Sequence, residues 1–428
     1  MIMKYFGSSG IRGLWNEKIT PQLTMKVGNA ISVSYNKVII GTDFRVTSDV
    51  VVSALISGLL SGGADVYSAG YVSTSTLAYA TKDYDCGVMI TASHNPPEYN
   101  GIKLWNPDGL AFTTPQMENI EKRIDDKESK RVKWNEINSF HKIDIIKSHM
   151  DAIKKEIDIK DVDVIIDCGN GAASTISPLL FREMGASVTS INSNPDGYFS
   201  GRLSEPSEDN LQDLIGLVRK KGAAVGIAHD GDGDRFVAVT SEGRYLGGDM
   251  ILAIFIKYFG FKEVVVPVDT SMLIDKLTEK VHRCKVGDVY VGEMMKNEGV
   301  EFGGEPSGTQ IFSLFRYTPD AVYAAAKMLQ IASNTNLEEM ISSFPKYITK
   351  RKNIRYEERD KENIIKKLND FAETQENVTK IDGIRIGYND GWVLVRFSGT
   401  EPLIRITVEG EDEKVVDDYL NKIVEVLI

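Results

Sequence analysis

Residues 91–96 read TASHNP and place a serine, a histidine and an asparagine within one short segment. The segment follows the apolar run Cys86–Ile90, so we expect it at the end of a buried strand, where open α/β sheets bind their ligands. Pro96 and Pro97 stiffen the backbone, and Ser93 is therefore expected on a rigid, exposed turn. Taken alone, these residues fit an ordinary Asn-Pro turn as well as a reactive serine, so the rest of the chain must decide between the two.

Three aspartates alternate with two glycines shortly after another apolar run, Ala223–Ala228. They are Asp230, Asp232 and Asp234. Glycines let the backbone curl, so the three carboxylates can face one point and form an oxygen site suited to Mg²⁺ or Mn²⁺. An EF-hand is excluded, because its sixth and twelfth positions would be Arg235 and Ser241 instead of glycine and glutamate. Carboxylates this close repel one another, which favours a metal site over an acidic surface turn.

Two further loops carry polar groups of a different kind. In GGEPSGT, residues 303–309, Glu305 and Ser307 suit the hydroxyl groups of a sugar, although a plain turn explains them as well. In RFSGTEP, residues 396–402, arginine, hydroxyl groups and a free backbone amide describe a pocket for a phosphate dianion; the alternative is a polar hairpin loop with solvated arginines. The phosphate pocket would consist of Arg396, Ser398, Gly399, Thr400 and Arg405.

The opening of the chain offers one more candidate anion site. Residues 7–13 read GSSGIRG and place three glycines around Arg12, so backbone amides and a guanidinium group could approach an anion closely. Glycine-rich turns are commoner than phosphate-binding loops, and this segment alone does not establish a ligand.

Length and composition indicate a globular protein of several domains. The 428 residues suggest about three or four domains. A net charge of −11 argues against a broad nucleic-acid or anionic-membrane surface. The N-terminus lacks a signal-peptide pattern and no apolar run is long enough to span a membrane, so a cytoplasmic protein is expected. Cys86 and Cys168 are expected to be buried thiols and not part of a disulfide framework.

A unit of strand, turn, helix and strand recurs three times along the chain. The first strands of the three units are Lys37–Asp43, Val162–Asp167 and Lys262–Asp269. The helix of the third unit is expected to extend to about Lys280. Beyond residue 346 the pattern changes to alternating strands and an amphipathic helix, Glu413–Leu427.

The predicted fold class is therefore α/β, with three tandem related α/β domains and a smaller C-terminal α+β domain. Polar, charge-rich stretches mark the expected boundaries between them. The predicted domains are residues 1–138, 139–240, 241–345 and 346–428.

Together, these motifs resemble the α-D-phosphohexomutase family. Its members carry a serine loop, a metal loop, a sugar loop and a phosphate loop in the order found here, and the resemblance covers essentially the whole chain. The matching segments are FGSSGIRG (6–13), TASHNP (91–96), NGIK (100–103), PDGYFSGRLSEP (195–206), DGDGDR (230–235), KVGD (285–288), GEPSG (304–308) and RFSGTEP (396–402). The resemblance implies four domains around one central cleft, each lending a loop.

The resemblance also implies a mechanism. Active members carry a phosphate on the serine that matches Ser93, pass it to a hexose phosphate, and take back the other phosphate of the resulting hexose 1,6-bisphosphate. One Mg²⁺ per site is implied, with Ser93 and the three aspartates as ligands, to screen the phosphoserine charge. Lys103 matches the family's general acid/base, His94 is a second candidate, and Arg12 would stabilise the transferring group. The implied substrate-binding residues are Arg235, Lys285, Glu305, Ser307, Arg396, Ser398, Gly399, Thr400 and Arg405.

The sequence leaves the sugar open. Many relatives have histidine directly after the GExSG loop, where this chain has Thr309, so that role is absent here or is taken by another group. Residues 286–291 and 398–411 look like those of phosphoglucosamine mutases, whereas residues 91–104 also look like those of phosphomannomutase/phosphoglucomutases. We favour conversion of glucosamine 6-phosphate to glucosamine 1-phosphate, with mannose or glucose phosphate as the alternative.

Two alternatives come from other functional classes. A sugar phosphatase would use the same serine and metal but needs no second phosphate pocket. A non-catalytic sugar-phosphate binder would not need to retain Ser93, the aspartates and Lys103. The expected partners are small-molecule hexose phosphates, with no nucleic acid and no membrane, and the chain is expected as a monomer or homodimer.

Overall fold

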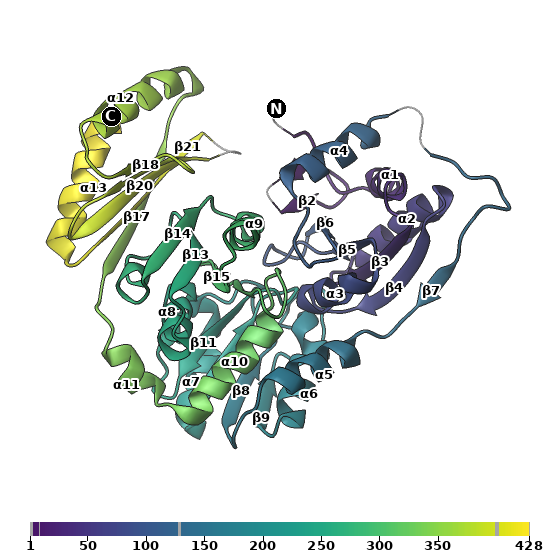
Figure 1. Cartoon of the computed structure of the whole chain (residues 1–428), viewed down its shortest axis with the longest axis horizontal. Coiled ribbons are helices and arrows are strands. Elements are labelled where there is room, and N and C mark those ends of the chain that lie inside the picture. Colours follow the sequence, from purple (N-terminus) through teal and green to yellow (C-terminus); the bar gives the residue numbers. More distant parts are fainter. Residues whose placement is uncertain (1–2, 8, 127–129, 399–401, 428) are drawn as a thin grey trace.

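The computed structural model describes residues 3–7, 9–126, 130–398 and 402–427, and these residues form four β-sheets arranged in chain order (Figure 1). The first three sheets contain parallel strands flanked by helices, and the fourth is antiparallel. The predicted fold class, three α/β domains followed by a smaller C-terminal domain, is confirmed. Within the described residues no helix is long and apolar enough to cross a bilayer.

The first sheet has the strand order β1-β2-β6-β5-β3-β4-β7. Its strands are β1 Phe6–Gly7, β2 Gly10–Leu14, β3 Lys37–Thr42, β4 Asp65–Tyr71, β5 Cys86–Ile90, β6 Tyr99–Trp105 and β7 Phe140–Lys142. Strands β3, β4, β5 and β7 run parallel, and β3 is buried along nearly its whole length, as expected for a strand covered on both faces. Because β3 and β5 are parallel neighbours, their carboxyl ends lie side by side. The helices of this domain are α1 Pro21–Ser32, α2 Ser48–Ser61, α3 Thr74–Ala80 and α4 Thr114–Ile124.

The second and third sheets share one apolar core, which runs without interruption from Ile166 and Ile227 to Phe255 and Val266. The second sheet, in the order β12-β11-β10-β8-β9, consists of β8 Asp163–Asp167, β9 Ser187–Ile191, β10 Val225–His229, β11 Phe236–Thr240 and β12 Tyr245–Leu246. The third, in the order β14-β13-β15-β16, consists of β13 Glu263–Pro267, β14 Lys280–Cys284, β15 Phe302–Gly304 and β16 Gln310–Phe312. Their helices are α5 Ile146–Glu156, α6 Ser177–Glu183, α7 Gln212–Lys221, α8 Gly248–Phe259, α9 Asp288–Glu298, α10 Ala321–Asn334 and α11 Leu337–Ser342.

The C-terminal domain has its own core, formed where two helices cover one face of an antiparallel sheet. The sheet has the order β17-β21-β20-β19-β18, with β17 Ile348–Arg355, β18 Val378–Thr379, β19 Ile384–Gly387, β20 Gly391–Phe397 and β21 Leu403–Gly410. The helices are α12 Lys361–Glu373 and α13 Glu413–Leu427, and α13 was predicted from its amphipathic pattern.

The structure differs from the sequence predictions in two respects. Strand β7 completes the first sheet and β12 completes the second, so the first sheet extends past residue 138 and the second past residue 240. The helix predicted to run to about Lys280 is absent: the described residues there form a short 3₁₀ turn, Ile274–Lys276. The cause lies in the C-terminal domain, because Glu409 accepts hydrogen bonds from the Ser271 hydroxyl and the Met272 amide, at 2.9 Å each, and fixes this segment in a turn. The prediction of buried thiols is confirmed, since Cys86 and Cys168 are both buried and free.

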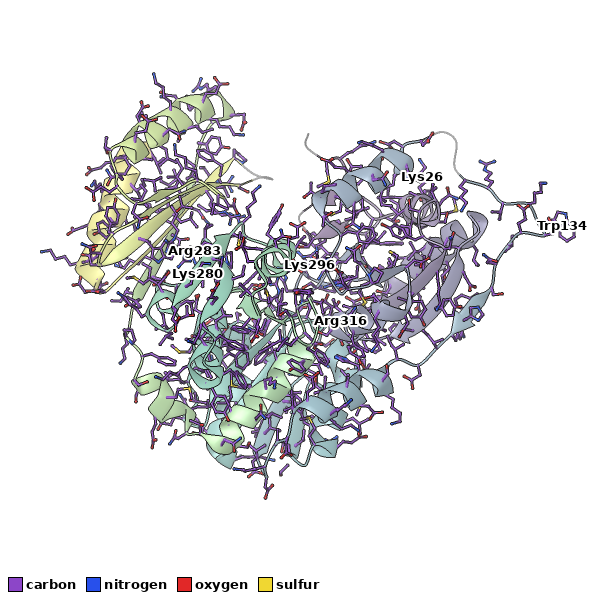
Figure 2. The ribbon with its side chains drawn as sticks, in the orientation of Figure 1. Lys26, Trp134, Lys280, Arg283, Lys296 and Arg316 are labelled. Atoms are coloured by element: carbon purple, nitrogen blue, oxygen red, sulfur yellow. The ribbon has the colours of Figure 1, made fainter. Side chains whose placement is uncertain are left out.

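Polar contacts join the first and third domains. Arg316, after β16, donates to the Pro107 carbonyl oxygen at 2.6 Å, and the Lys296 ammonium on α9 lies 2.6 Å from the Asp108 carboxylate. Figure 2 shows both side chains between the third and first sheets. The loop 106–111 is thereby held against the third domain, directly after strand β6, which carries Lys103.

A second junction attaches the C-terminal domain to the third domain. Val268 and Met272 pack against Trp392 and Leu394 in a small apolar cluster, all four buried. Beside this cluster, Glu409 on β21 makes the hydrogen bonds to Ser271 and Met272 described above. A compact apolar contact and one buried carboxylate therefore fix this end of the C-terminal sheet.

Packing of α1 against α2 depends on glycine. A Cβ atom on Gly58 would collide with the Met25 carbonyl oxygen, which is backbone and cannot rotate away. We expect Gly58→Ala to destabilise the first domain by about 1–3 kcal/mol through overpacking, measured as the shift of its urea unfolding transition. Gly216→Ala on α7 is the matched control, since its Cβ atom meets open space. The control should be neutral or stabilising by about 0.5–1 kcal/mol; equal destabilisation by both substitutions would contradict this account.

Asp249, in the first turn of α8, makes stability depend on pH. Burial, followed by Glu409 and Asp269, raises the pKa of Asp249 from its ordinary value of 3.8 to about 7, against the lowering effect of the Ser271 amide and Arg351. A raised pKa means that the folded protein binds the proton more tightly, so this contribution to stability is complete below about pH 4 and is lost as the pH rises through about 7.

We therefore expect Asp249→Asn to raise the thermal midpoint relative to the parent protein at pH 8, with little gain at pH 4.5. Asparagine keeps the acceptor for the Ser271 amide, which lies 3.0 Å from Oδ1, while removing the charge. Differential scanning calorimetry at the two pH values makes the comparison. A gain of equal size at both pH values would show that the carboxyl group does not titrate in this way.

Candidate active site

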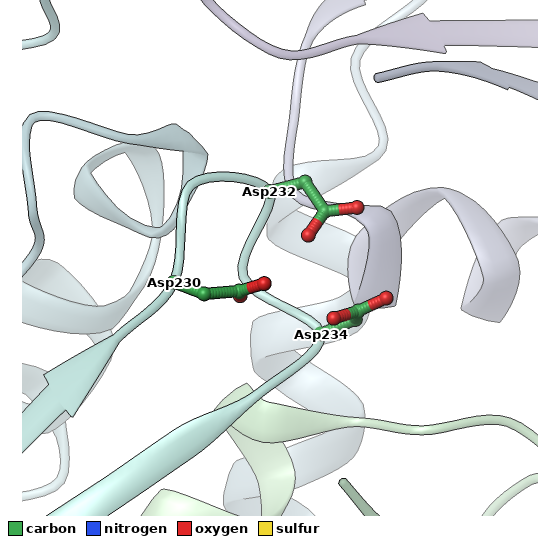
Figure 3. A group of neighbouring side chains, drawn as sticks. All are labelled: Asp230, Asp232 and Asp234. Carbon is green, nitrogen blue, oxygen red and sulfur yellow. The ribbon is translucent and has the colours of Figure 1, made fainter. Parts of the chain in front are cut away.

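The three aspartates lie in a tight loop between β10 and β11. The Asp230 Oδ1 atom accepts hydrogen bonds from the Gly233 amide at 3.0 Å and the Arg235 amide at 3.2 Å, and Gly233 adopts a φ of +71° that favours glycine. The loop therefore curls as predicted, and ligand oxygens of Asp230, Asp232 and Asp234 lie within 4.8 Å of one another. Figure 3 shows the three carboxylates turned toward a common space.

This cluster has the chemistry of a divalent-cation site. All three side chains are buried, and one oxygen each of Asp232 and Asp234 has no hydrogen-bond partner among the described residues. Burial, and then the neighbouring Asp232 charge, raise the pKa values of Asp230 and Asp234. Buried, mutually repelling carboxylates with free oxygens are the donor set that hard cations bind.

Ser93 points directly at this cluster. Its Oγ atom donates to Asp230 Oδ2 at 2.9 Å, and its backbone has a φ of 50°, in the left-handed region that a serine rarely adopts. The prediction of an exposed turn is wrong: Ser93 is only 1% exposed. The loop 195–206 covers it, because the Ser204 hydroxyl donates to the Ser93 carbonyl oxygen at 3.1 Å, and Gly231 of the metal loop packs against the same carbonyl.

Arg45 holds the serine loop and was missed in the sequence. It follows β3, is 2% exposed, and forms a buried ion pair with Asp43 at 3.1 Å. The Arg45 guanidinium group also donates to four backbone carbonyl oxygens, three in the serine loop and one at the start of β6, at 2.5–3.0 Å. These are the carbonyls of Ser93, Asn95, Pro96 and Tyr99. The sequence offered one signal. Asp43 directly follows the apolar strand, as Asp230 follows an apolar run, and Arg45 lies two residues after Asp43.

Asp43 links this scaffold to the strand that precedes Ser93. It accepts hydrogen bonds from the Thr91 hydroxyl at 2.6 Å and the Ser48 hydroxyl at 3.1 Å. Thr91 in turn accepts the Ser93 amide at 2.8 Å. The unusual backbone of Ser93 is thus fixed by a continuous buried network that extends across the carboxyl ends of β3 and β5.

Lys103 lies in the middle of the site. It projects from β6, and its Nζ atom lies 2.7 Å from Asp234 Oδ2 and 3.3 Å from Asp232 Oδ2. Burial lowers the Lys103 pKa, but the two aspartates outweigh it and the pKa is raised above its ordinary value. Lys103 is therefore charged in this arrangement and carries a proton beside Asp232 and Asp234.

Three further predicted residues surround the serine and the aspartates. Arg12 on β2 donates to Asn95 Oδ1 at 2.8 Å, and Arg235 Nε lies 3.9 Å from Asp234 Oδ1. His94 Nδ1 lies 3.5 Å from Ser93 Oγ. Burial, then the nearby arginines Arg235 and Arg12, lower the His94 pKa to about 3, so its imidazole is neutral near pH 7.

The sugar loop is built around the Glu305 carboxylate. Glu305 follows β15 and accepts the Gly287 amide at 2.8 Å, the Thr309 hydroxyl at 3.1 Å and the Ser307 hydroxyl at 3.3 Å. Burial, then the Asp288 charge, raise the Glu305 pKa to about 7. Thr309, at the position where many relatives have histidine, therefore orients Glu305. Lys285 is exposed, with its ammonium 5.6 Å from the centre of the Tyr290 ring.

The remaining predicted residues belong to the C-terminal sheet. Arg396 on β20 pairs directly with Arg405 on β21, so the two side chains project from the same face of the sheet. The Ser398 amide donates to the Leu403 carbonyl oxygen at 2.8 Å. Gly399 and Thr400 lie outside the described residues. Arg396 and Arg405 thus form a separate group from the cluster of Ser93, Lys103 and the aspartates.

Comparison with known families identifies the class of protein. Four models of phosphoglucomutase/phosphomannomutase match in succession: α/β/α domain I over residues 3–131, domain II over 143–243, domain III over 247–347, and the C-terminal domain over 352–426. The chain belongs to the phosphoglucomutase/phosphomannomutase family, as the motifs of the sequence indicated.

Individual relatives and a solved structure resemble this chain over nearly its whole length. A probable phosphoglucosamine mutase of Methanosarcina barkeri is 47% identical, with 96% of each chain covered. A phosphoglucosamine mutase of Methanococcus aeolicus is 40% identical, with 98% of this chain and 97% of the relative covered. Among solved structures, a phosphoglucomutase/phosphomannomutase family protein of Burkholderia thailandensis superposes with a TM-score of 0.88 at 25% identity, covering 98% of this chain and 96% of that one.

The buried scaffold of the serine loop can be tested by stability. We expect Arg45→Met to destabilise the first domain by about 3–5 kcal/mol, because it leaves the Asp43 carboxylate and four carbonyl oxygens buried without their partner. Urea unfolding measures the loss. Lys4→Ala is the control: it removes an ion pair to Asp125 in the same domain whose side chains are 63% and 48% exposed, and it should cost less than about 1 kcal/mol. Similar small losses in both variants would refute the scaffold role of Arg45.

Proposed function

We propose that this chain is a phosphohexose mutase that converts glucosamine 6-phosphate to glucosamine 1-phosphate. The observation that carries the proposal is the hydroxyl of Ser93, held 2.9 Å from Asp230 in a buried cluster of three carboxylates. The relatives at 40–47% identity that cover nearly the whole chain are named phosphoglucosamine mutases, which supports the choice of sugar. The reaction class is an intramolecular phosphotransfer, which is an isomerisation.

In this proposal Ser93 carries the phosphoryl group between turnovers. The three aspartates, with the Ser93 phosphate, would hold one Mg²⁺, which supplies positive charge against the phosphoserine dianion. Arg45 and Thr91 keep Ser93 in its left-handed conformation, so that the oxygen faces the cluster and does not rotate away. Arg12 and Arg235 flank the same space and can donate to the equatorial oxygens of a phosphoryl group in transfer.

Lys103 is the proposed general acid/base. The bond between phosphorus and the Ser93 oxygen breaks and a bond to a sugar hydroxyl oxygen forms; the sugar hydroxyl loses its proton, the freed Ser93 oxygen takes one up, and the reverse transfer moves the protons the opposite way. Lys103 Nζ lies 2.7 Å from Asp234 and 3.3 Å from Asp232; its ammonium form would give a proton to the leaving oxygen, and the neutral amine that remains would accept the proton of the attacking hydroxyl. His94 is a second candidate, because it is neutral and 3.5 Å from the Ser93 oxygen.

The sugar and its second phosphate are assigned to the other two loops. Glu305 and Ser307 would bind sugar hydroxyl groups, and Lys285 would approach the substrate from the segment before α9. Arg396 and Arg405, with Ser398, Gly399 and Thr400, would grip the phosphate that is not reacting. Gripping the distal phosphate positions the sugar oxygen at Ser93 by binding energy remote from the reaction. The hexose 1,6-bisphosphate would exchange the roles of its two phosphates before returning one to Ser93.

A mannose or glucose phosphate is the second candidate substrate. The family models carry the names of both phosphoglucomutase and phosphomannomutase, and the Glu305 loop has Thr309 in place of histidine. The amine and hydroxyl groups that distinguish these sugars at the second carbon present similar hydrogen-bonding groups to a carboxylate. We also propose that one chain supplies the whole site, so that a monomer or a homodimer is equally competent.

Phosphorus NMR tests the function directly. With Mg²⁺ and a trace of hexose 1,6-bisphosphate, we expect glucosamine 6-phosphate to yield a sugar 1-phosphate signal faster than mannose or glucose 6-phosphate does.

Ser93→Ala should lower turnover by several orders of magnitude while leaving the thermal midpoint within a few degrees, since it removes a single oxygen. Chelation of divalent metal should likewise abolish turnover.

Other outcomes of the same experiment would overturn parts of the proposal. Growth of free phosphate without a sugar 1-phosphate would make the protein a phosphatase. Binding without any turnover would make it a sugar-phosphate binder. Turnover in the Ser93→Ala variant close to that of the parent protein would refute the phosphoserine mechanism.

A further inference from the structure

We propose that Asp382, in the turn before β19, is a positioning residue that holds the Arg396 guanidinium group ready for the distal phosphate and ties it to the sugar loop. The inference rests on the proposed function, because it concerns the phosphate pocket assigned to Arg396. Asp382 belongs to none of the motifs of the sequence. Its role is inferred from its contacts with Arg396 in the C-terminal domain and with Val286 in the third domain.

The first contact joins Asp382 to Arg396. Asp382 Oδ2 lies 2.8 Å from Arg396 Nη2, and the two side chains are 25% and 27% exposed. Arginine has five N–H donors in a rigid fork, and this contact uses one nitrogen of the three. The Arg396 Nε atom is buried and has no hydrogen-bond partner among the described residues. Asp382 therefore holds one nitrogen of the guanidinium group and leaves its other nitrogens for a second anion.

The second contact joins Asp382 to the third domain. The Val286 amide, in the segment between β14 and α9, donates to the same Oδ2 atom at 3.1 Å. In Figure 1 the end of the C-terminal sheet formed by β20 and β21 lies above α9. One carboxylate oxygen thus receives an arginine from one domain and a backbone amide from another.

The segment that Asp382 binds also holds the sugar loop. Val286 and Gly287 are consecutive, and the Gly287 amide donates to Glu305 Oε1 at 2.8 Å. Gly287 has a φ of +137°, which a residue with a side chain rarely adopts, so these two adjacent amides can point to different carboxylates. A short path of hydrogen bonds therefore runs from Arg396 through Asp382, Val286 and Gly287 to Glu305.

This path gives Asp382 a definite task. The distance between the distal phosphate and the sugar hydroxyl groups is limited by the few bonds that join them in a hexose phosphate, so the groups that bind them must stay within that separation. Asp382 holds the phosphate arginine to the segment that anchors the sugar carboxylate, which sets that separation before substrate arrives. The alternative is that Asp382 competes with the phosphate for Arg396, and the two roles predict opposite changes in affinity.

Calorimetric titration with glucosamine 6-phosphate and, separately, with inorganic phosphate tests the inference alongside the turnover assay. Asp382→Ala should weaken binding of both ligands and raise KM by about tenfold or more, with kcat changed much less. Asp382→Asn keeps an acceptor oxygen and should stay within about threefold of the parent protein. Asp370→Ala, which removes an exposed carboxylate on α12 of the same domain, should change nothing.

Tighter phosphate binding by Asp382→Ala would overturn the positioning role in favour of competition, and binding equal to that of the parent protein would overturn both roles. If the alanine variant unfolds, the asparagine variant decides: a tenfold loss there would also refute an acceptor-based role. Binding of both ligands by the parent protein without turnover would refute the proposed function. The binding data would still test the positioning role of Asp382.

The connection to the sugar loop has its own test in the double variant Asp382→Ala with Glu305→Ala. Because both substitutions release the same two-residue segment, the combined increase in Kd for glucosamine 6-phosphate should be smaller than the product of the single increases. Increases that multiply would show independent sites and would overturn the connection through Val286 and Gly287.

Discussion

The mutual repulsion of three buried carboxylates is the constraint on which the site depends. Asp230, Asp232 and Asp234 are forced together by a loop whose glycines permit the curl, and the surrounding structure supplies the opposing charge. Lys103 approaches from the first domain, and Arg12 and Arg235 stand close by. Residues of two domains thus depend on one charge cluster, so the approach of β6 to the metal loop has an electrostatic cause as well as a steric one.

Arginine also has a structural task at this centre. Arg45 is buried and donates hydrogen bonds to Asp43 and to backbone carbonyl oxygens of the serine loop. These bonds hold a loop without regular secondary structure in one conformation. Arg202 acts similarly from the loop 195–206, where its Nη2 atom donates to the His229 carbonyl oxygen at 2.5 Å, one residue before Asp230. Buried arginines suit this work because one planar group can satisfy several carbonyls at fixed angles.

Much of the site could be predicted from the sequence, because its signals are local. The convergence of the three aspartates follows from the alternation of aspartate and glycine within five residues, and the position of the serine loop follows from the strand that precedes it. The exposure of Ser93 could not be predicted, since Ser204, which covers it, lies 111 residues away. Arg45 left no motif because its partners are mostly backbone carbonyls, which every residue carries. The helix expected after Asp269 failed for a similar reason: Glu409, which fixes the turn, is 138 residues from Ser271.

The sharing of one apolar core by the second and third sheets affects how the chain is synthesised. Neither sheet can bury its apolar face alone, because Phe236 and Phe255 lie in one cluster with residues of both. The first sheet, by contrast, is complete once β7 at residues 140–142 has left the ribosome. Co-translational folding should therefore proceed in three stages, not four, with the middle half of the chain waiting for α10 before it can close. During that wait β10 and β11, which are buried along their whole length in the folded protein, are exposed and are the segments most in need of a chaperone.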